Sequence, residues 1–237
     1  RAAKGIPSTA AITPIQFCEK YCQYVDEGYT DVIHVPINRS GSSTYNNAVM
    51  AQGMLREERP EHHLNIHLLD PHTYSMVFGW YLCEMARKLQ NGAELRHVIS
   101  EFETQMNKME VILGPYSLKQ MKKSGRISAA AAVMGELMGI RPIITLIDGK
   151  TRVESKVRGD DKVIPAMIDL CKKRTEGVED FDYMIGHTSI PQAAELEKAC
   201  RKAFGKAPLT TFNLGGVVSA NTGPDTLALI YVGKARD

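Results

Sequence analysis

Residues 31–48 read DVIHVPINRSGSSTYNNA and decide the fold of this chain. The β-branched run 31–37 predicts a strand, and the pattern from Tyr45 to about Leu55 predicts a helix. The loop between them holds one glycine and four hydroxyl side chains. Free backbone N–H groups and the positive end of the helix dipole meet at such a loop, and Ser and Thr add donors. The stretch therefore predicts an anion site, for a carboxylate or a phosphate, at Ser42, Ser43 and Thr44.

The alternative for this loop is that one of its hydroxyls only caps the helix. Every helix start leaves N–H groups to be capped, so capping is the default for an isolated motif of this kind. The chain contains neither G-x-G-x-x-G nor G-x-x-x-x-G-K-[ST], so dinucleotide and P-loop chemistry lack their main support.

The composition is that of an ordinary soluble globular protein, with 237 residues, 43% hydrophobic and 24% charged. A net charge of +2 gives no electrostatic case for nucleic acid. No apolar run reaches the length of a membrane span, and we expect a cytoplasmic protein. The odd number of cysteines favours reduced core thiols, although two of them, one helical turn apart, are in principle able to share a metal. With no second pair of ligands we expect no metal site; the cysteines are Cys18, Cys22, Cys83, Cys171 and Cys200.

The order of the expected elements predicts an α/β protein of two domains. In the first half, strands and helices alternate, which favours a parallel sheet covered by helices. In the second half, residues 142–157 form a hairpin around Asp148-Gly149, which favours a mixed or antiparallel sheet. We place the boundary near residue 110, giving domains 1–110 and 111–237 with a ligand cleft between them. The remaining expected helices are 14–27, 72–90, 93–108, 117–123, 129–137, 160–174 and 191–204, and the remaining strands are 64–69, 110–113, 183–186 and two or three within 209–232 around residues 221–225.

Histidines offer two further candidate sites. His62, His63, His67 and His72, with Asp70, resemble a metal cluster in sequence. However, His63 and His67 fall on an expected strand, where side chains four apart are about 13 Å from each other. Surface histidines are therefore the expected interpretation. His187 is placed at a strand end, but no nucleophile-elbow serine accompanies it, and a structural polar residue is the default there.

Basic residues offer another candidate. Lys119, Lys122, Lys123 and Arg126 cluster near an expected helix end, where cations commonly complement the dipole. Ser124-Gly125-Arg126 and Arg158-Gly159 place a guanidinium in a turn, where it can face a cleft. Residues alone thus lead to a two-domain α/β protein that binds a small anion, with no set of nucleophile, base and metal.

Five stretches, in order, resemble motifs of the bacterial DegV family. Thr9 to Pro14 correspond to Thr-Ser-x-Pro-Ser-Pro, and Asn38 to Tyr45 to Ser-x-x-x-Ser-Gly-Thr-Tyr. Residues 121–128 correspond to Leu-x-x-Gly-Gly-Arg-Ile-Ser, residues 156–159 to Lys-x-Arg-Gly, and residues 221–225 to His-Thr-Gly-Pro-Gly. Ser43 and Ser124 stand where the family usually has Gly, and Asn221 where it has His. The resemblance spans the chain, and the family's first strand and Asp-Ser pair are missing, so we expect an incomplete N-terminal domain.

The resemblance implies two α/β domains with one long-chain fatty acid in a tunnel between them, and no cofactor. It also implies that some members act as the lipid-binding subunit of a fatty-acid kinase, whose separate ATP-using subunit phosphorylates the carboxylate. The chain itself is then not an enzyme. The implied carboxylate-binding residues are Thr9, Ser42, Ser43 and Asn221, and the implied head-group or partner contacts are Thr44, Arg126 and Arg158. Asn221 cannot carry the positive charge of a His, which weakens the kinase role relative to lipid binding.

Two other functions stay open at this point. One is a phosphotransferase or hydrolase that uses the Ser42–Thr44 loop as a phosphate cup, with Arg126 or Arg158 as the electrophile. The other is a structural interaction module without an internal pocket.

Overall fold

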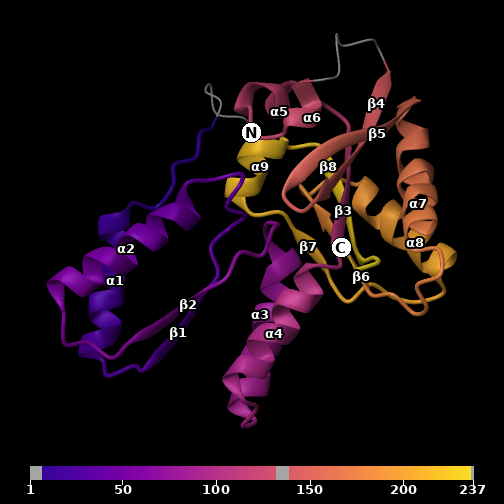
Figure 1. Ribbon diagram of the computed structural model, residues 1–237. Helices are drawn as coiled ribbons and strands as arrows, with labels where there is room; N and C mark the ends of the chain where they lie inside the picture. The colour runs from indigo at the N-terminus through magenta and orange to yellow at the C-terminus, as the bar shows by residue number, and fades with distance from the viewer. Residues whose placement is uncertain (1–6, 132–138, 236–237) are drawn as a thin grey trace. The chain divides into compact units, whose positions relative to one another are not determined.

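The computed structural model describes residues 7–131 and 139–235, and its helices and strands can be followed in Figure 1. The chain folds into two compact units. The small unit is Ala10–Tyr74; the large unit continues from Ser75 and includes Thr9. The two helices that follow residue 75 thus belong to the same unit as the later strands. The domain boundary predicted near residue 110 lies after these two helices, and it stays a prediction.

The small unit is a two-stranded parallel sheet with two helices packed on it. β1 (Asp31–His34) pairs with β2 (Asn65–Leu68), with Asp31 opposite Asn65. α1 (Pro14–Asp26) begins with the predicted capping box, in which Thr13 and Gln16 bond to each other's backbone N–H. α2 is Thr44–Glu58. The apolar faces of both helices and the chain before β2 form one core: Phe17, Cys18, Tyr21, Cys22, Ala48, Ala51, Leu55 and Leu64.

The large unit is built on a mixed six-stranded sheet of order β5-β4-β3-β8-β6-β7. All neighbours are antiparallel except β6 and β7, which are parallel. Buried residues run without a break from Thr226 to Tyr231, because β8 lies inside the sheet with both faces covered. The strands are β3 (Met109–Pro115), β4 (Ile140–Ile147), β5 (Lys150–Arg158), β6 (Tyr183–His187), β7 (Thr211–Asn213) and β8 (Thr226–Val232).

Helices of the large unit cover its sheet and flank it (Figure 1). α7 and α8 pack on one face, where Met167 and Leu196 join Ile112, Ile185 and Leu229 in a continuous core. Together with the small parallel sheet, this architecture confirms the predicted α/β class. The helices are α3 (Met76–Gln90), α4 (Leu95–Met106), α5 (Lys119–Ser124), α6 (Ser128–Ala131), the 3-10 turn η1 (Asp160–Lys162), α7 (Val163–Arg174), α8 (Gln192–Phe204) and α9 (Gly216–Thr222).

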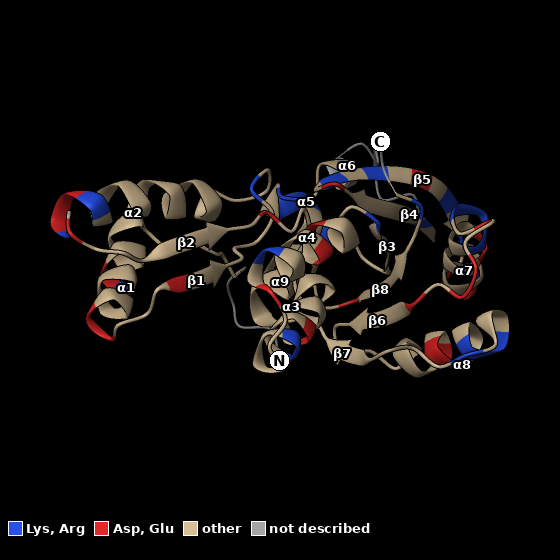
Figure 2. Cartoon of the chain, turned by 60° about the horizontal axis from the view of Figure 1, so that its bottom comes forward, with Lys and Arg blue, Asp and Glu red and all other residues tan. Residues whose placement is uncertain are grey.

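The predicted hairpin is confirmed and forms an edge of the large sheet. Asp148 and Gly149 both have positive φ, 49° and 70°, as a type I′ turn requires. β5 is the edge strand, and Figure 2 shows Lys and Arg along it. Charged side chains on an edge strand oppose pairing with another sheet. The exposed cations of β5 are Lys150, Arg152, Lys156 and Arg158.

Three sequence-based expectations differ from the structure. The strand expected to reach residue 37 ends at His34, before Pro36, which has no N–H to donate. The helix expected from residue 72 begins at Met76, because His72 and Ser75 adopt positive φ of 54° and 61°. Two of the expected two or three strands are present within 209–232, and the difference there is that residues 216–222 form α9, a helix not expected from the sequence, between β7 and β8. The helix expected over 129–137 is described only as far as Ala131, and its remainder lies outside the described residues.

Candidate functional site

The loop after β1 is held in place by a buried residue, Asn38. The Asn38 side chain is 1% exposed, and its Oδ1 accepts hydrogen bonds from the Ser40 N–H at 3.1 Å and the Ser40 hydroxyl at 3.0 Å. The Asn38 N–H donates to the Thr73 carbonyl at 3.0 Å, and Asn38 Nδ2 donates to the Tyr74 hydroxyl at 3.0 Å. These bonds fix the curve of the loop independently of any ligand.

The hydroxyl groups predicted to bind an anion sit where this loop enters α2. Ser42 Oγ and Thr44 Oγ1 lie 2.7 Å apart, and Ser42 Oγ accepts from the Thr44 N–H at 3.2 Å. Ser43 is the N-cap residue of α2, is exposed, and makes no side-chain capping hydrogen bond. The Ser42 hydroxyl therefore caps one backbone N–H group at the helix start, that of Thr44, as the capping alternative predicts. The exposed Ser43 hydroxyl caps none. A 15-residue helix with its positive end at these hydroxyls favours negative charge there.

A second segment, at the end of β2, completes this loop and was not recognised from the sequence. Asp70 Oδ1 accepts from the backbone N–H of Arg39 at 3.4 Å and of His72 at 2.9 Å. Thr73 is 4% exposed, and its hydroxyl oxygen has no hydrogen-bond partner among the described residues. Because β1 and β2 are parallel, both segments leave the sheet at the same edge, which is where open α/β sheets bind ligands. The strand pairing is the signal that could have revealed Thr73 and Asp70.

Gly41 is the residue that lets Tyr74 approach the loop, and its replacement gives a first prediction. A Cβ at Gly41 would lie 1.7 Å from the Tyr74 hydroxyl oxygen, so Tyr74 must move and lose its bond from buried Asn38. We expect Gly41→Ala to lower the free energy of unfolding by about 1–3 kcal/mol, measured by urea denaturation.

Gly53→Ala on α2 is the matched control for this prediction. A Cβ there meets nothing within 4 Å, and Ala favours a helix interior by up to about 1 kcal/mol over Gly. A Gly41→Ala protein as stable as the Gly53→Ala protein would contradict the close approach of Tyr74.

The other predicted head-group residues belong to the large unit. Thr9 is half-buried and lies before α1, and its proximity to Ser42 stays a prediction. Asn221 is on α9, and its Nδ2 donates to the Val217 carbonyl at 2.8 Å. Its own carbonyl accepts from the Ser124 hydroxyl at 3.2 Å, which brings α9 against the turn that carries exposed Arg126. The structure thus brings Asn221 and the Ser124–Arg126 turn together.

Arg158 is attached at the far end of β5 from that turn. Ser128, two residues after Arg126, has its hydroxyl 2.9 Å from that of Thr151 near the start of β5. Arg158 is the last residue of the strand, seven residues further along, or about 23 Å at 3.3 Å per residue. The two guanidinium groups are therefore anchored at opposite ends of β5, and Arg158 also belongs to the exposed cations that protect this edge.

The histidine candidates have local structural partners. His67 is on β2 and its Nε2 lies 2.9 Å from Asp31 Oδ1, whereas His63 precedes the strand instead of lying on it. His62 Nδ1 accepts from the Leu64 N–H at 3.1 Å. His187 Nδ1 accepts from the Ser189 N–H at 3.0 Å, as expected for a structural polar residue at a strand end. These contacts agree with the interpretation of structural and surface histidines.

A pocket of about 320 Å³ lies along α3 and α4 of the large unit. Three of its lining residues are paired with each other, since Lys88 and His97 both contact the Glu101 carboxylate, and a fourth, Glu84, pairs with Arg87. The hydrogen bond from Lys88 lowers the pKa of Glu101. This pocket shares no residue with the hydroxyl loop.

A family comparison decides the relationship suggested by the five motifs. The model of a family described as "Uncharacterised protein, DegV family" matches residues 1–234. The chain belongs to the DegV family. A DegV domain-containing protein of Clostridium perfringens is 29% identical over 232 residues, covering 96% of this chain and 78% of the relative. One of Staphylococcus aureus is 27% identical over 238 residues, covering 98% and 80%.

Several solved structures share the fold, and their descriptions name fatty-acid binding or a bound fatty acid. The fatty-acid-binding DegV protein of Streptococcus agalactiae is 26% identical, with a TM-score of 0.84 over 98% of this chain and 81% of that one. A stearic-acid-binding protein of Eubacterium ventriosum is 21% identical, with a TM-score of 0.86 over 98% and 80%. A DegV protein of Eubacterium eligens, loaded with heptadecanoic acid, is 22% identical, with a TM-score of 0.78 over 98% and 82%.

Within the described ranges of this DegV chain, no helix combines the length and the apolar character that a membrane span requires.

Proposed function

We propose that this protein binds one long-chain fatty acid, with the carboxylate at the hydroxyl loop that enters α2. The observation that carries the proposal is the Ser42–Thr44 hydroxyl pair, 2.7 Å apart at the positive end of a 15-residue helix. Fatty-acid binding by solved DegV proteins supports a carboxylate over a phosphate as the anion.

Apolar side chains in the same unit offer a surface for the alkyl chain. Val49 and Met50 on α2 are 49% and 60% exposed, and Ile12 and Ile15 at the start of α1 are 47% and 60% exposed. Asn47 Nδ2 donates to the Ile12 carbonyl at 2.7 Å, which joins the two helix starts. Val49 and Met50 lie five and six residues after Thr44, a rise of about 8–9 Å along the helix. Around the helix axis they lie about 140° and 240° from Thr44, so an alkyl chain that starts at the hydroxyls reaches them by crossing the helix surface.

The alkyl tail and the carboxylate contribute differently to the free energy of binding. Burying about fourteen methylenes at about 0.8 kcal/mol each gives a gross gain of about 11 kcal/mol. A hydrogen bond to a charged carboxylate contributes about 1.5–3 kcal/mol. The tail would supply most of the affinity, and the hydroxyls would select an acid over an uncharged lipid of the same length.

The finer roles of individual residues are part of the same proposal. Thr9 and Asn221 would complete the carboxylate site with Ser42 and Ser43, in a tunnel between two domains. Because the Asn221 amide bonds within α9, it would have to turn away from Val217 to reach a ligand. Thr44, Arg126 and Arg158 would contact the head group or an ATP-dependent fatty-acid kinase subunit.

The decisive experiment is native mass spectrometry of the purified protein, before and after addition of stearic acid. We expect a mass increase of one fatty acid per chain. A protein that carries no fatty acid and takes up none would refute the proposal. Turnover of ATP or a phosphoester by the isolated chain would instead support the phosphate-cup alternative.

Removal of the hydroxyl groups gives a second prediction. Ser42→Ala combined with Thr9→Ala should weaken stearic acid binding by about 10- to 100-fold and leave octadecanol binding nearly unchanged, because only the acid loses charged hydrogen bonds. Displacement of a fluorescent fatty acid measures both ligands.

Ser40→Ala is the control for this pair of substitutions. It removes a hydroxyl of the same loop that is bonded to Asn38, while the Ser40 N–H still donates to Asn38 Oδ1 and keeps the curve of the loop, so the preference for acid over alcohol should stay as in the unmodified protein. An unchanged preference in the Ser42→Ala, Thr9→Ala protein would remove the loop from the carboxylate site.

A further inference from the structure

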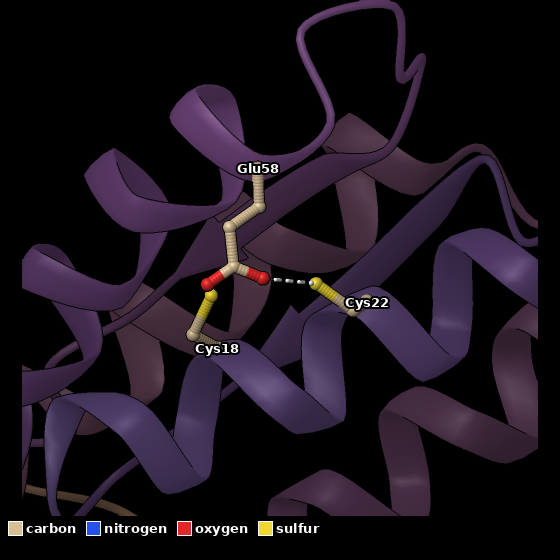
Figure 3. A group of neighbouring side chains, drawn as sticks. All are labelled: Cys18, Cys22 and Glu58. Atoms are coloured by element: carbon tan, nitrogen blue, oxygen red, sulfur yellow. Dashed lines mark hydrogen bonds between the residues drawn. The ribbon is translucent and has the colours of Figure 1, made fainter.

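Two cysteines and a glutamate converge in the small unit, on the side of α1 that packs against α2. Cys18 and Cys22 are one turn apart on α1, and Glu58 is the last residue of α2; Figure 3 shows the carboxylate facing both sulfurs. Among the described residues, this is the one group of three or more His, Cys, Asp or Glu side chains whose ligand atoms all lie within 4.8 Å of each other. Sequence spacing revealed the cysteine pair, but Glu58 is 36 residues from Cys22 and is brought to it only by helix packing.

The separations in this cluster suit a tetrahedral metal ion. With Zn–S bonds of about 2.3 Å and Zn–O bonds of about 2.0 Å, a neighbouring sulfur and oxygen lie about 3.5 Å apart, and two sulfurs about 3.8 Å. Cys22 Sγ and Glu58 Oε2 are 3.5 Å apart. No two ligand atoms are more than 4.8 Å apart, so movements of the side-chain ligand atoms by about 1 Å are enough to complete the coordination.

We propose that Cys18, Cys22 and Glu58 form a Zn²⁺ site, with a water molecule as the fourth ligand. Two sulfur donors select a thiophilic cation over Mg²⁺ or Ca²⁺, which prefer oxygen. Cys18 is 1% exposed and Cys22 9% exposed, whereas Glu58 is exposed, so the ion would enter on the Glu58 side. The site is independent of the ligand at the hydroxyl loop.

Protons on the two thiols compete with the ion at this site. Burial raises the pKa of the Cys18 thiol to about 12, and burial together with the hydrogen bond to Glu58 raises that of Cys22. Zn²⁺ binding would break both S–H bonds, form two Zn–S bonds and release two protons to solvent. The three ligands then carry a charge of −3, which the ion reduces to −1, and the positive charge of Arg59 lies near Cys22.

The test is a Zn²⁺ titration against a chromophoric chelator, in reducing buffer, on the intact chain. We expect one Zn²⁺ per chain, an unchanged affinity in Cys83→Ser, an affinity about 100-fold lower in Cys22→Ser, and about 10-fold lower in Glu58→Gln. Cys83 is an exposed cysteine of α3 and serves as the matched control. Co²⁺ should give a thiolate-to-metal absorption band with the unmodified protein and Cys83→Ser but not with Cys22→Ser, which separates this site from surface histidines.

Two results would overturn the proposal. One is a chain that binds no stoichiometric Zn²⁺, and the other is an affinity for Zn²⁺ that is the same in Glu58→Gln as in the unmodified protein. Glu58 is exposed, so its replacement is compatible with folding and decides the question even where Cys22→Ser fails to fold.

Discussion

Replacement of Arg174 by Met is expected to lower the free energy of unfolding by about 3–5 kcal/mol. Arg174, at the end of α7, donates to Glu110 on β3 through Nε at 2.5 Å and Nη2 at 3.4 Å. The Glu110 side chain is only 9% exposed and also accepts from the buried Tyr231 hydroxyl at 2.7 Å. Without Arg174, the buried carboxylate loses its counter-charge. Urea denaturation followed by circular dichroism measures the change.

Two further variants of the same chain make this prediction specific. Adding Glu110→Gln to Arg174→Met removes the stranded charge, so part of the lost stability should return. Arg201→Met breaks the pair with Glu197 on α8, in which the Arg201 side chain is 52% exposed, and should change stability by less than about 1 kcal/mol. If Arg174→Met behaved like Arg201→Met, the Glu110 network would not contribute to stability.

Leu55→Ala is expected to cost the small unit about 2–5 kcal/mol. Leu55 is 1% exposed on α2 and belongs to a core of only eight buried residues. A core of that size has few neighbours that can fill the cavity left by the leucine side chain. Hydrogen exchange should show faster amide exchange in α1, α2, β1 and β2, because opening of this unit becomes easier.

Val49→Ala separates stability from ligand binding on the same helix. Val49 is 49% exposed, so its truncation should leave hydrogen exchange almost unchanged. If the alkyl chain of the ligand lies on this surface, the affinity for stearic acid should nevertheless fall. Equal exchange rates in Leu55→Ala and the unmodified protein would contradict the assigned core of the small unit.

Elements with strong local signals were predictable from the sequence. Thr13, Pro14 and Gln16 specify the start of α1, and Asp148-Gly149 specifies the hairpin, because each depends on residues within a few positions. α9 lacked such a signal, since Val217 and Val218 favour a strand. In the structure, α9 packs against α5. Three of its side chains also donate hydrogen bonds to backbone carbonyls four or five residues earlier: Ser219 to Leu214, Asn221 to Val217 and Thr222 to Val218.

The candidate site was predictable only where it is continuous in sequence. Ser42, Ser43 and Thr44 lie between a strand and a helix or at the helix start, so the sequence alone predicts an anion site there, which stays a prediction. Thr73 and Tyr74 reach the same loop through the parallel pairing of β1 and β2, which the sequence does not encode at short range. Glu58 was missed as a partner of the cysteines for the same physical reason, because helix packing alone brings it near.

The position of β8 has a consequence for how the protein is synthesised. β3 and β8 are neighbours in the sheet, with Met109 opposite Val232, although they are more than a hundred residues apart in sequence. During translation, β3 must wait with one hydrogen-bonding edge and much of its apolar surface unpaired until residues 226–232 leave the ribosome. The small unit contains only local segments by comparison, so it can fold while the rest of the chain is still being made. We therefore expect chaperones that hold nascent chains to bind the large unit in preference to the small one.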